Sequence, residues 1–186
     1  MTTYDLTAAG LKAPTKCTPR MRSNTATFPS VLTGSIQTVA RPGERWELDI
    51  VWENLTGGDL DDLVAFFTRL NGAEHRVNLK MFGHANRGTL SGTPLVDGAS
   101  QTGSTIDIDG VGTVTNWARA RDFISFDNQI RMVTADTNSS AGDATLPIWP
   151  AIRTSPSNNA AVTVSNPTGI FILMTPVESA ISAFSQ

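Results

Sequence analysis

The sequence predicts a mainly β fold of the α+β class, namely a β-sandwich with one packed helix and an inserted small β-barrel-like domain. Only 17% of the 186 residues are charged, against about 25% in a typical globular domain, and Ser and Thr, which suit strands and turns, fill much of the gap. Apolar and polar residues alternate in several segments, whereas a single segment has helical spacing. After residue 83, short strand candidates recur at the spacing typical of small barrels and sandwiches.

Residues 1–30 are predicted to form an N-terminal arm, because they are polar and interrupted by three prolines. Four basic residues outnumber the single acid, Asp5, so the local net charge is 4 − 1 = +3. The four are Lys12, Lys16, Arg20 and Arg22. We expect a solvated, flexible terminus. The functional alternative is a subunit clasp, in which these cations dock on an acidic neighbouring subunit. Without aromatic neighbours they make a thin patch for nucleic acid.

The segment 46–52 is predicted to be a half-buried strand with one face exposed to solvent. Two sets of residues alternate along it: Trp46, Leu48, Ile50 and Trp52 against Glu47, Asp49 and Val51. Residues 33–39 are expected to pair with this strand across a turn at Pro42-Gly43.

The segment 59–70 is predicted to be the one helix. Its apolar residues form a single stripe at helical spacing: Leu60, Leu63, Val64, Phe67 and Leu70. Acidic residues open the segment, where the helix dipole favours negative charge, and Asn71-Gly72 supplies a left-handed stop. A second clean strand follows at 76–81, with Arg76, Asn78 and Lys80 on one face and Val77, Leu79 and Met81 on the other. The helix should therefore cover one face of a sheet.

Beyond residue 83 the sequence becomes rich in Gly, Thr and Ser. Residues 121–134 predict a hairpin that turns at Asp127-Asn128. The strand at 144–149 is expected at a sheet edge, because prolines flank Ile148-Trp149. The run 170–174 is apolar on both faces, so it should lie inside the structure and return to the sheet formed by earlier residues.

This pattern divides the chain into three parts. Residues 31–85 and 160–186 form a main β domain, residues 86–159 form the inserted small β domain, and residues 1–30 form the arm. The tail, Ser179 to Gln186, is expected to form a short helix or to fray.

Sequence motifs for catalysis are missing, so we expect no enzyme, no cofactor and no metal site. The chain has one cysteine and two histidines, which excludes a disulfide framework and a three-histidine zinc site within one chain. No apolar run is long enough for a transmembrane helix, so no membrane insertion is expected. Two tryptophans outside the predicted core strand, Trp117 and Trp149, are candidate exposed aromatics for stacking on a carbohydrate.

Two stretches resemble a pattern in the minor tail proteins of long-tailed bacteriophages. The first is Asp122-Phe-Ile-Ser-Phe-Asp-Asn-Gln-Ile-Arg-Met-Val-Thr-Ala-Asp136, and the second is Gly142-Asp-Ala-Thr-Leu-Pro-Ile-Trp-Pro-Ala-Ile-Arg153. Residues 46–81, read as strand, helix and strand, are similar to the tail-tube-like domain of tube, distal tail and baseplate hub proteins. The resemblance covers roughly residues 30–175.

The resemblance implies a distal tail protein, six copies of which form a ring at the tail tip. That ring would join the tail tube protein on one side to the hub on the other and let DNA pass without sequence recognition. The protein would be made in the host cytoplasm and reside in the virion. The residues on the solvent-exposed strand faces then become candidate ring or lumen contacts: Glu47, Asp49, Glu53, Arg76, Asn78 and Lys80.

Four other interpretations remain open. A tail tube protein needs a long β-forming loop between subunits, for which residues 53–58 are too short, and a hub or collar protein of the same tail is a close competitor. A carbohydrate-binding β module of the attachment apparatus would need an exposed aromatic platform. A tail-associated hydrolase is disfavoured by the missing catalytic motifs, although carboxylate pairs can meet in three dimensions without a sequence signature.

Overall fold

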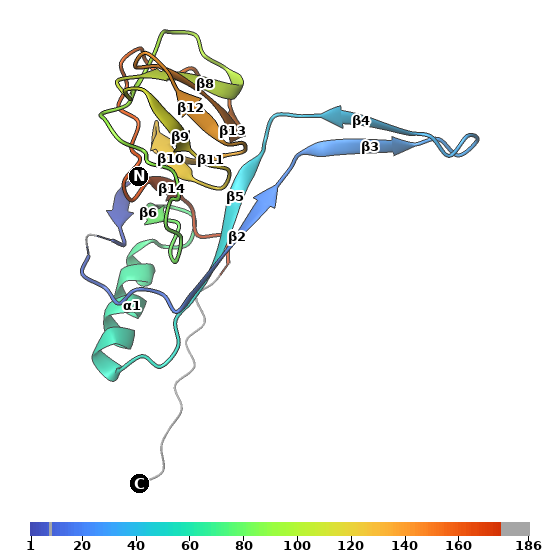
Figure 1. Cartoon of the computed structure of the whole chain (residues 1–186). Helices are drawn as coiled ribbons and strands as arrows, with labels where there is room; N and C mark the ends of the chain where they lie inside the picture. The colour runs from blue at the N-terminus through green and yellow to red at the C-terminus, as the bar shows by residue number, and fades with distance from the viewer. Residues whose placement is uncertain (8, 176–186) are drawn as a thin grey trace.

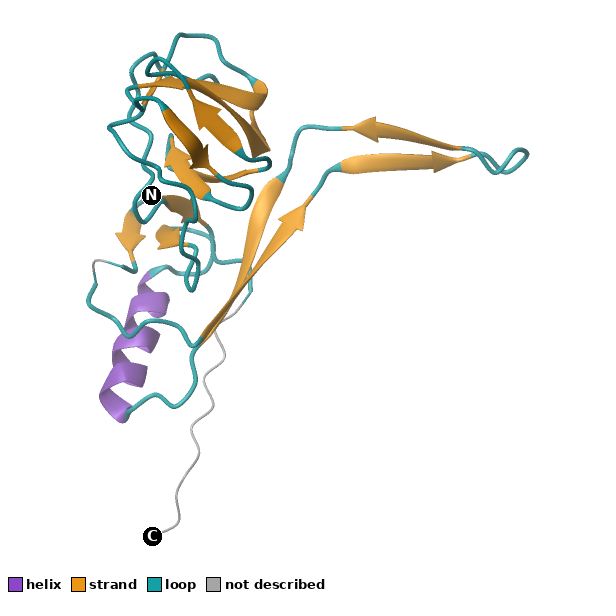
Figure 2. Cartoon of the chain, viewed as in Figure 1, coloured by secondary structure: helices purple, strands orange, loops and turns teal. Residues whose placement is uncertain are grey.

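The structure is a computed structural model that describes residues 1–7 and 9–175. It is mainly β, with 43% strand, 7% helix and one helix in the described part, which confirms the predicted class (Figures 1 and 2). The strands are β1 Thr3–Asp5, β2 Lys16–Arg22, β3 Thr25–Pro29, β4 Ile36–Ala40, β5 Arg45–Val51, β6 Arg76–Lys80, β7 Leu95–Val96, β8 Gly103–Asp109, β9 Val114–Ala118, β10 Phe123–Phe126, β11 Gln129–Val133, β12 Thr137–Ser139, β13 Ala144–Ile152 and β14 Thr168–Phe171; the helix is α1 Gly57–Arg69. The predicted tail, 179–186, lies outside the described residues.

A long, bent β-hairpin leaves the body of the molecule (Figure 1). Strands β2 and β5 pair antiparallel at its base, and β3 and β4 pair antiparallel beyond the bend. We call β2 and β5 the proximal arm and residues 25–40 the distal arm. The predicted flexible terminus is therefore wrong, because most of residues 16–30 lie in strands.

The predicted pairing of residues 33–39 with the strand at 46–52 is also wrong. The hairpin turns at residues 30–35, where the Ser30 amide donates to the Ser35 carbonyl over 2.8 Å. Pro42-Gly43 marks the bend between the two halves of the arm instead. There the Asn24 side-chain amide donates to the Pro42 carbonyl over 2.8 Å, and Gly43 has a φ of 139°, which favours glycine.

Helix α1 packs on one face of a three-stranded sheet of order β1-β6-β14. The core between them includes Phe66, Leu70, Val77 and Leu79, and the inner face of β5 also contributes to it. The helix's apolar stripe is shifted from the predicted one: Phe66 is buried and Val64 is 37% exposed. Strand β14 pairs antiparallel with β6, so the last run does return to an earlier strand.

A second sheet has the order β10-β11-β13-β8-β7, and β12 pairs with β9 beside it. Together they enclose the larger core, which includes Ile106, Ile108, Trp117 and Leu146. The predicted edge position of residues 144–149 is wrong, since β13 lies between β11 and β8. Pro150 is tolerated because the pairing with β8 is interrupted between Pro147 and Ile152, where a missing amide costs no ladder bond. The boundaries of the inserted domain stay a prediction.

Candidate functional site

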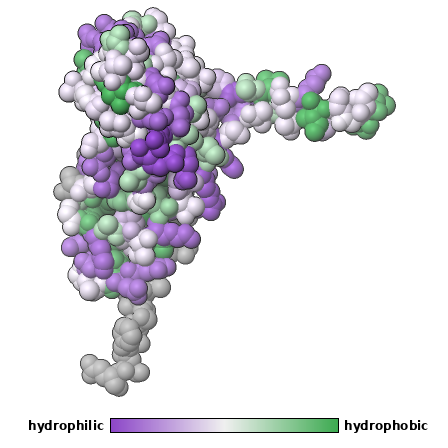
Figure 3. Space-filling view, in the orientation of Figure 1, coloured by the Kyte–Doolittle hydropathy of each residue, from purple (hydrophilic) through white to green (hydrophobic). Residues whose placement is uncertain are grey.

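The distal arm is the most exposed part of the chain. No charged residue lies between Arg22 and Arg41, yet five large apolar side chains face solvent there: Phe28 51%, Val31 101%, Leu32 95%, Ile36 66% and Val39 48% exposed. Figure 3 shows apolar residues (green) on this projecting arm and at its tip. None of its residues belongs to a core cluster of the described chain. An isolated two-stranded ribbon of this kind is marginal in water and exposes pairing edges.

The proximal arm has two different faces. Its apolar face packs on the body through Trp46, Leu48, Ile50 and Trp52. Its other face carries two ion pairs that run diagonally across the two strands and a third within β5. Arg20 contacts Asp49 at 2.6 Å and Arg22 contacts Glu47 at 3.6 Å, while Arg45 contacts Glu47 at 3.0 Å.

These ion pairs join two sets of residues that the sequence analysis kept apart. Arg20 and Arg22 were candidates for the subunit clasp, and Asp49 and Glu47 were candidates for ring or lumen contacts. Within one chain they partner each other: Arg20 and Asp49 form one pair, and Glu47 is shared by Arg22 and Arg45. Because all four side chains are at least 40% exposed, each pair contributes little to stability, about 0–1 kcal/mol.

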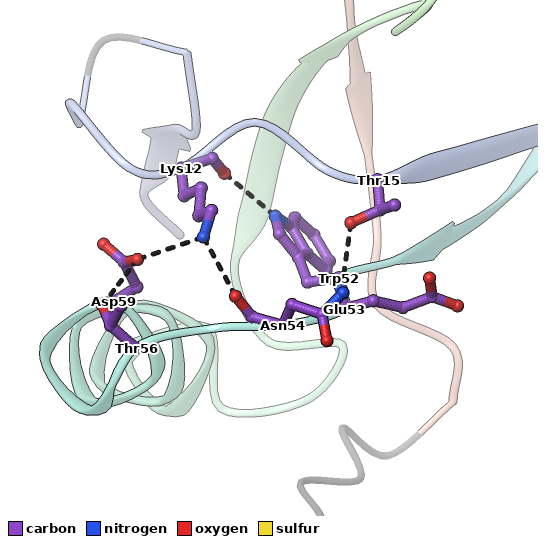
Figure 4. Close-up of polar contacts among 7 residues, drawn as sticks. All are labelled: Lys12, Thr15, Trp52, Glu53, Asn54, Thr56 and Asp59. Atoms are coloured by element: carbon purple, nitrogen blue, oxygen red, sulfur yellow. Dashed lines mark hydrogen bonds and ion pairs between the residues drawn. The ribbon is translucent and has the colours of Figure 1, made fainter.

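The base of the arm is tied to the start of helix α1 by a polar network (Figure 4). The Lys12 ammonium lies 3.3 Å from an Asp59 carboxylate oxygen and 3.2 Å from the Asn54 carbonyl. The Trp52 indole donates to the Lys12 carbonyl over 2.9 Å. Lys12, predicted to be part of the clasp, therefore has a partner within its own chain, whereas Lys16 is exposed on β2.

Asp59 is held as a carboxylate by its neighbours. The Thr56 hydroxyl donates to it over 2.7 Å, and this hydrogen bond, followed by the one from Lys12, lowers the pKa of Asp59 below its ordinary value of 3.8. Nearby, the Glu53 amide donates to the Thr15 hydroxyl over 3.0 Å. The network fixes residues 12–15 against the helix and thereby sets where β2 begins.

The remaining strand candidates lie on the face of the β1-β6-β14 sheet that is opposite helix α1. Arg76, Asn78 and Lys80 alternate with the buried Val77 and Leu79, as predicted. All three are half-buried. They share this face with side chains of β14, because Asn78 pairs with Ile170 in the register of the sheet. The structure thus gives the polar row an apolar neighbour that the sequence did not indicate.

The predicted exposed aromatics do not form a platform. Trp117 is fully buried, and its indole donates to the Ser91 carbonyl over 2.9 Å, so its predicted exposure is wrong. Trp149 is half-buried and meets Trp46 edge to face, with ring centroids 4.6 Å apart. A sequence cannot reveal that the loop around Ser91 closes over Trp117.

Contacts with β13 and the residue after it hold the arm's base against the second sheet. Besides the Trp46–Trp149 pair, the Arg153 guanidinium donates to the Glu44 carbonyl over 2.6 Å. The Ala151 amide donates to the Glu44 carboxylate over 3.3 Å. The direction in which the arm leaves the body is therefore fixed by both sheets.

The side chains that could act as nucleophiles, acids, bases or metal ligands are scattered over the described part of the chain. Burial raises the pKa of the Cys17 thiol, which opposes a nucleophilic role. Burial also lowers the pKa of His84, which lines a hollow of about 320 Å³ with Lys80 and Asn86. Within residues 1–7 and 9–175, no three His, Cys, Asp or Glu side chains gather as metal ligands. No helix in this part of the chain is long and apolar enough to cross a membrane.

The sequence was compared with models of protein families and with curated proteins, and neither comparison finds a match. The sequence predicted an arm at residues 1–30 but not the hairpin formed by β2 to β5, although a signal was present in the uninterrupted uncharged stretch between Arg22 and Arg41.

Proposed function

We propose that this protein is a structural component of a bacteriophage tail that assembles into a ring through its hairpin arm, most simply the distal tail ring between tube and hub. The observation that supports this is the distal arm, an uncharged β-hairpin whose exposed apolar side chains are not covered by the described part of the chain. A soluble chain rarely exposes such a surface without a partner for it.

The geometry of the arm also favours self-association over chemistry. Its edges offer unpaired backbone groups, which extend sheets between subunits. Its base is held to the second sheet by the contacts of Trp46 and Glu44, and it packs on the core of the first sheet through Leu48 and Ile50. A rigid base under a projecting apolar tip suits an arm that reaches a neighbour at a set angle, as a closed ring requires.

A second candidate function is the tail tube protein itself, which the same arm favours. The sequence argument against it assumed that the long β-forming segment between subunits would be residues 53–58. The long β-segment is present, but at residues 16–51, so that argument does not hold. A ring at the tail tip and a ring repeated along the tube are distinguished by whether rings stack.

The carbohydrate-binding alternative has less support than the sequence suggested. One of its two aromatics is buried and the other packs edge to face on Trp46. A glycan platform needs an aromatic face open to solvent.

The test is the mass of the purified protein by light scattering over a range of concentrations, followed by negative-stain imaging. Rings with a central hole support the proposal, and long stacked tubes support the second candidate within the same class. A monomer at every concentration, together with binding in a glycan screen, would contradict assembly and favour the carbohydrate-binding module.

A further inference from the structure

The C-terminal strand region exposes a second apolar surface. From residue 170 to 174 the chain alternates: Phe171 and Leu173 pack toward the helix side of the sheet. The residues between them face outward, with Ile170 39%, Ile172 43% and Met174 78% exposed. We call these three residues the apolar strip. The sequence pattern predicted burial on both faces, but the single chain buries only one.

The strip and the distal arm share their chemistry. No charged residue lies between Arg153 and Glu178, just as none lies between Arg22 and Arg41. Both surfaces are β-structured or adjoin a strand, and both expose large aliphatic side chains. Contact between them would remove both sets of exposed apolar side chains from water.

The arm does not cover the strip of its own chain. Figures 1 and 2 show the distal arm projecting away from the body, and the ties at its base hold it there. The arm and the strip are thus two different surfaces of one molecule, and within residues 1–7 and 9–175 neither covers the other. Two different complementary surfaces make a head-to-tail contact, which closes into a ring when the rotation allows it.

We propose that the apolar strip Ile170, Ile172 and Met174 is the docking surface for the distal arm of a second copy of this chain. This inference rests on the proposed assembly function and adds the surface that receives the arm. The polar row of β6 lies beside the strip on the same face, since Ile170 pairs with Asn78. Arg76 and Lys80 on that row would border the docked arm.

Site-directed crosslinking tests which surfaces meet. In a Cys17→Ser background, which removes the chain's one native thiol, one batch carries Leu32→Cys and another carries Ile172→Cys. After mixing and treatment with a short bifunctional maleimide, we expect a crosslinked dimer that neither batch gives alone. The matched control replaces Ile172→Cys with Val64→Cys, since Val64 is a similarly exposed apolar residue on helix α1, and should give none.

Each other outcome overturns the inference. Crosslinks within the Leu32→Cys batch alone would mean that arms meet arms, and crosslinks within the Ile172→Cys batch alone would mean that strips meet strips. Oligomers that form with no crosslink in the mixture would leave the assembly role standing but place the arm elsewhere. A protein that stays monomeric would instead contradict the proposed function itself.

Complementation provides a second readout that does not depend on thiol chemistry. A Val31→Asp/Leu32→Asp variant keeps an intact strip, and an Ile172→Asp variant keeps an intact arm. Each should be monomeric alone, while the mixture should reach twice the monomer mass and stop, because a single intact arm-to-strip contact remains. A mixture that stays monomeric would overturn the head-to-tail arrangement. Circular dichroism of each variant shows whether it has folded.

Discussion

The indole rings of Trp46 on β5 and Trp149 on β13 meet edge to face, with centroids 4.6 Å apart. This contact links the base of the hairpin arm to the second sheet, and thus two segments about a hundred residues apart in the chain. Each of these half-buried tryptophans therefore has an aromatic packing partner. The pair orients the arm while it contributes to the core near Phe123.

Removal of either indole ring should weaken the contribution of the other ring to the stability of the fold. We expect Trp149→Ala to lower the free energy of unfolding by about 2 kcal/mol, since the ring is half-buried and loses packing on one side. In a double-mutant cycle with Trp46→Ala, the coupling energy should be about 0.5–1.5 kcal/mol. Urea unfolding of the two single variants and the double variant measures it, and strictly additive effects would show that the rings do not interact.

Asp122 should be the polar side chain whose loss costs most. It is fully buried, and its carboxylate accepts from the backbone amides of Arg87, Gly88 and Arg119 at 2.6, 2.8 and 2.7 Å. Asp122→Ala leaves three amides without an acceptor, so stability should fall by about 3–5 kcal/mol. Asp136, exposed and bonded to a single amide, is the control, and Asp136→Ala should cost about 1 kcal/mol in chemical denaturation. Equal losses of stability in Asp122→Ala and Asp136→Ala would contradict the larger contribution predicted for Asp122.

Arg131 is a buried cation that the fold tolerates at a cost. It is 2% exposed, stacks over the Phe126 ring at 4.4 Å, and leaves Nε and Nη1 without partners. Burial, opposed by nearby Asp127, lowers its pKa to about 10. Because the folded pKa lies below the unfolded one, the penalty is full at neutral pH and is relieved as the pH rises through 10.

An apolar side chain of similar length should therefore serve better at this position. We expect Arg131→Met to raise the free energy of unfolding by about 1–3 kcal/mol at pH 7. Arg22→Met on the exposed face of the arm is the matched control and should change it by less than about 0.5 kcal/mol. Thermal and urea unfolding of both variants provide the comparison, and a destabilised Arg131→Met would mean that the charge is needed.

We call the contacts of Thr56 and Lys12 with the Asp59 carboxylate the clamp at the start of helix α1, and it should depend on pH through Asp59. Its pKa is lowered mainly by the Thr56 hydroxyl and then by Lys12. The clamp is therefore fully present above the ordinary value of 3.8 and is lost as the pH falls through the lower folded pKa. An NMR titration of the Asp59 carboxyl should show its pKa rising toward that ordinary value in Thr56→Val and Lys12→Met. An unchanged pKa in both variants would rule out these contacts in solution.

The elements that could be predicted from the sequence are those in which the local residue pattern agrees with the way the element packs in the fold. Strand β5, helix α1, strand β6 and the hairpin turn at Asp127-Asn128 lie close to the predicted positions. Asp127 and Asn128 both have positive φ, of 50° and 57°, which their short polar side chains tolerate. In each of these segments, the apolar residues of that segment form its buried face. The spacing of apolar residues in the sequence is therefore enough to identify that face.

The arm could not be predicted in the same way. Alternation identifies a strand only when one face is buried, and the distal arm buries neither face against the residues that the structure describes. The turn signal at Pro42-Gly43 was real, but Gly43 serves the bend and not the tip. The burial of Trp117 depends on a loop from elsewhere in the chain, which no local pattern encodes.

The central claim is that the distal arm drives assembly. Sedimentation velocity over a range of concentrations, on the wild-type chain and on the Val31→Asp/Leu32→Asp variant, tests it most directly. Both residues are at least 95% exposed, so the substitution should leave folding and thermal stability unchanged. The account predicts a wild-type oligomer that falls to a folded monomer in the variant. A variant that assembles as fully as the wild type would contradict it.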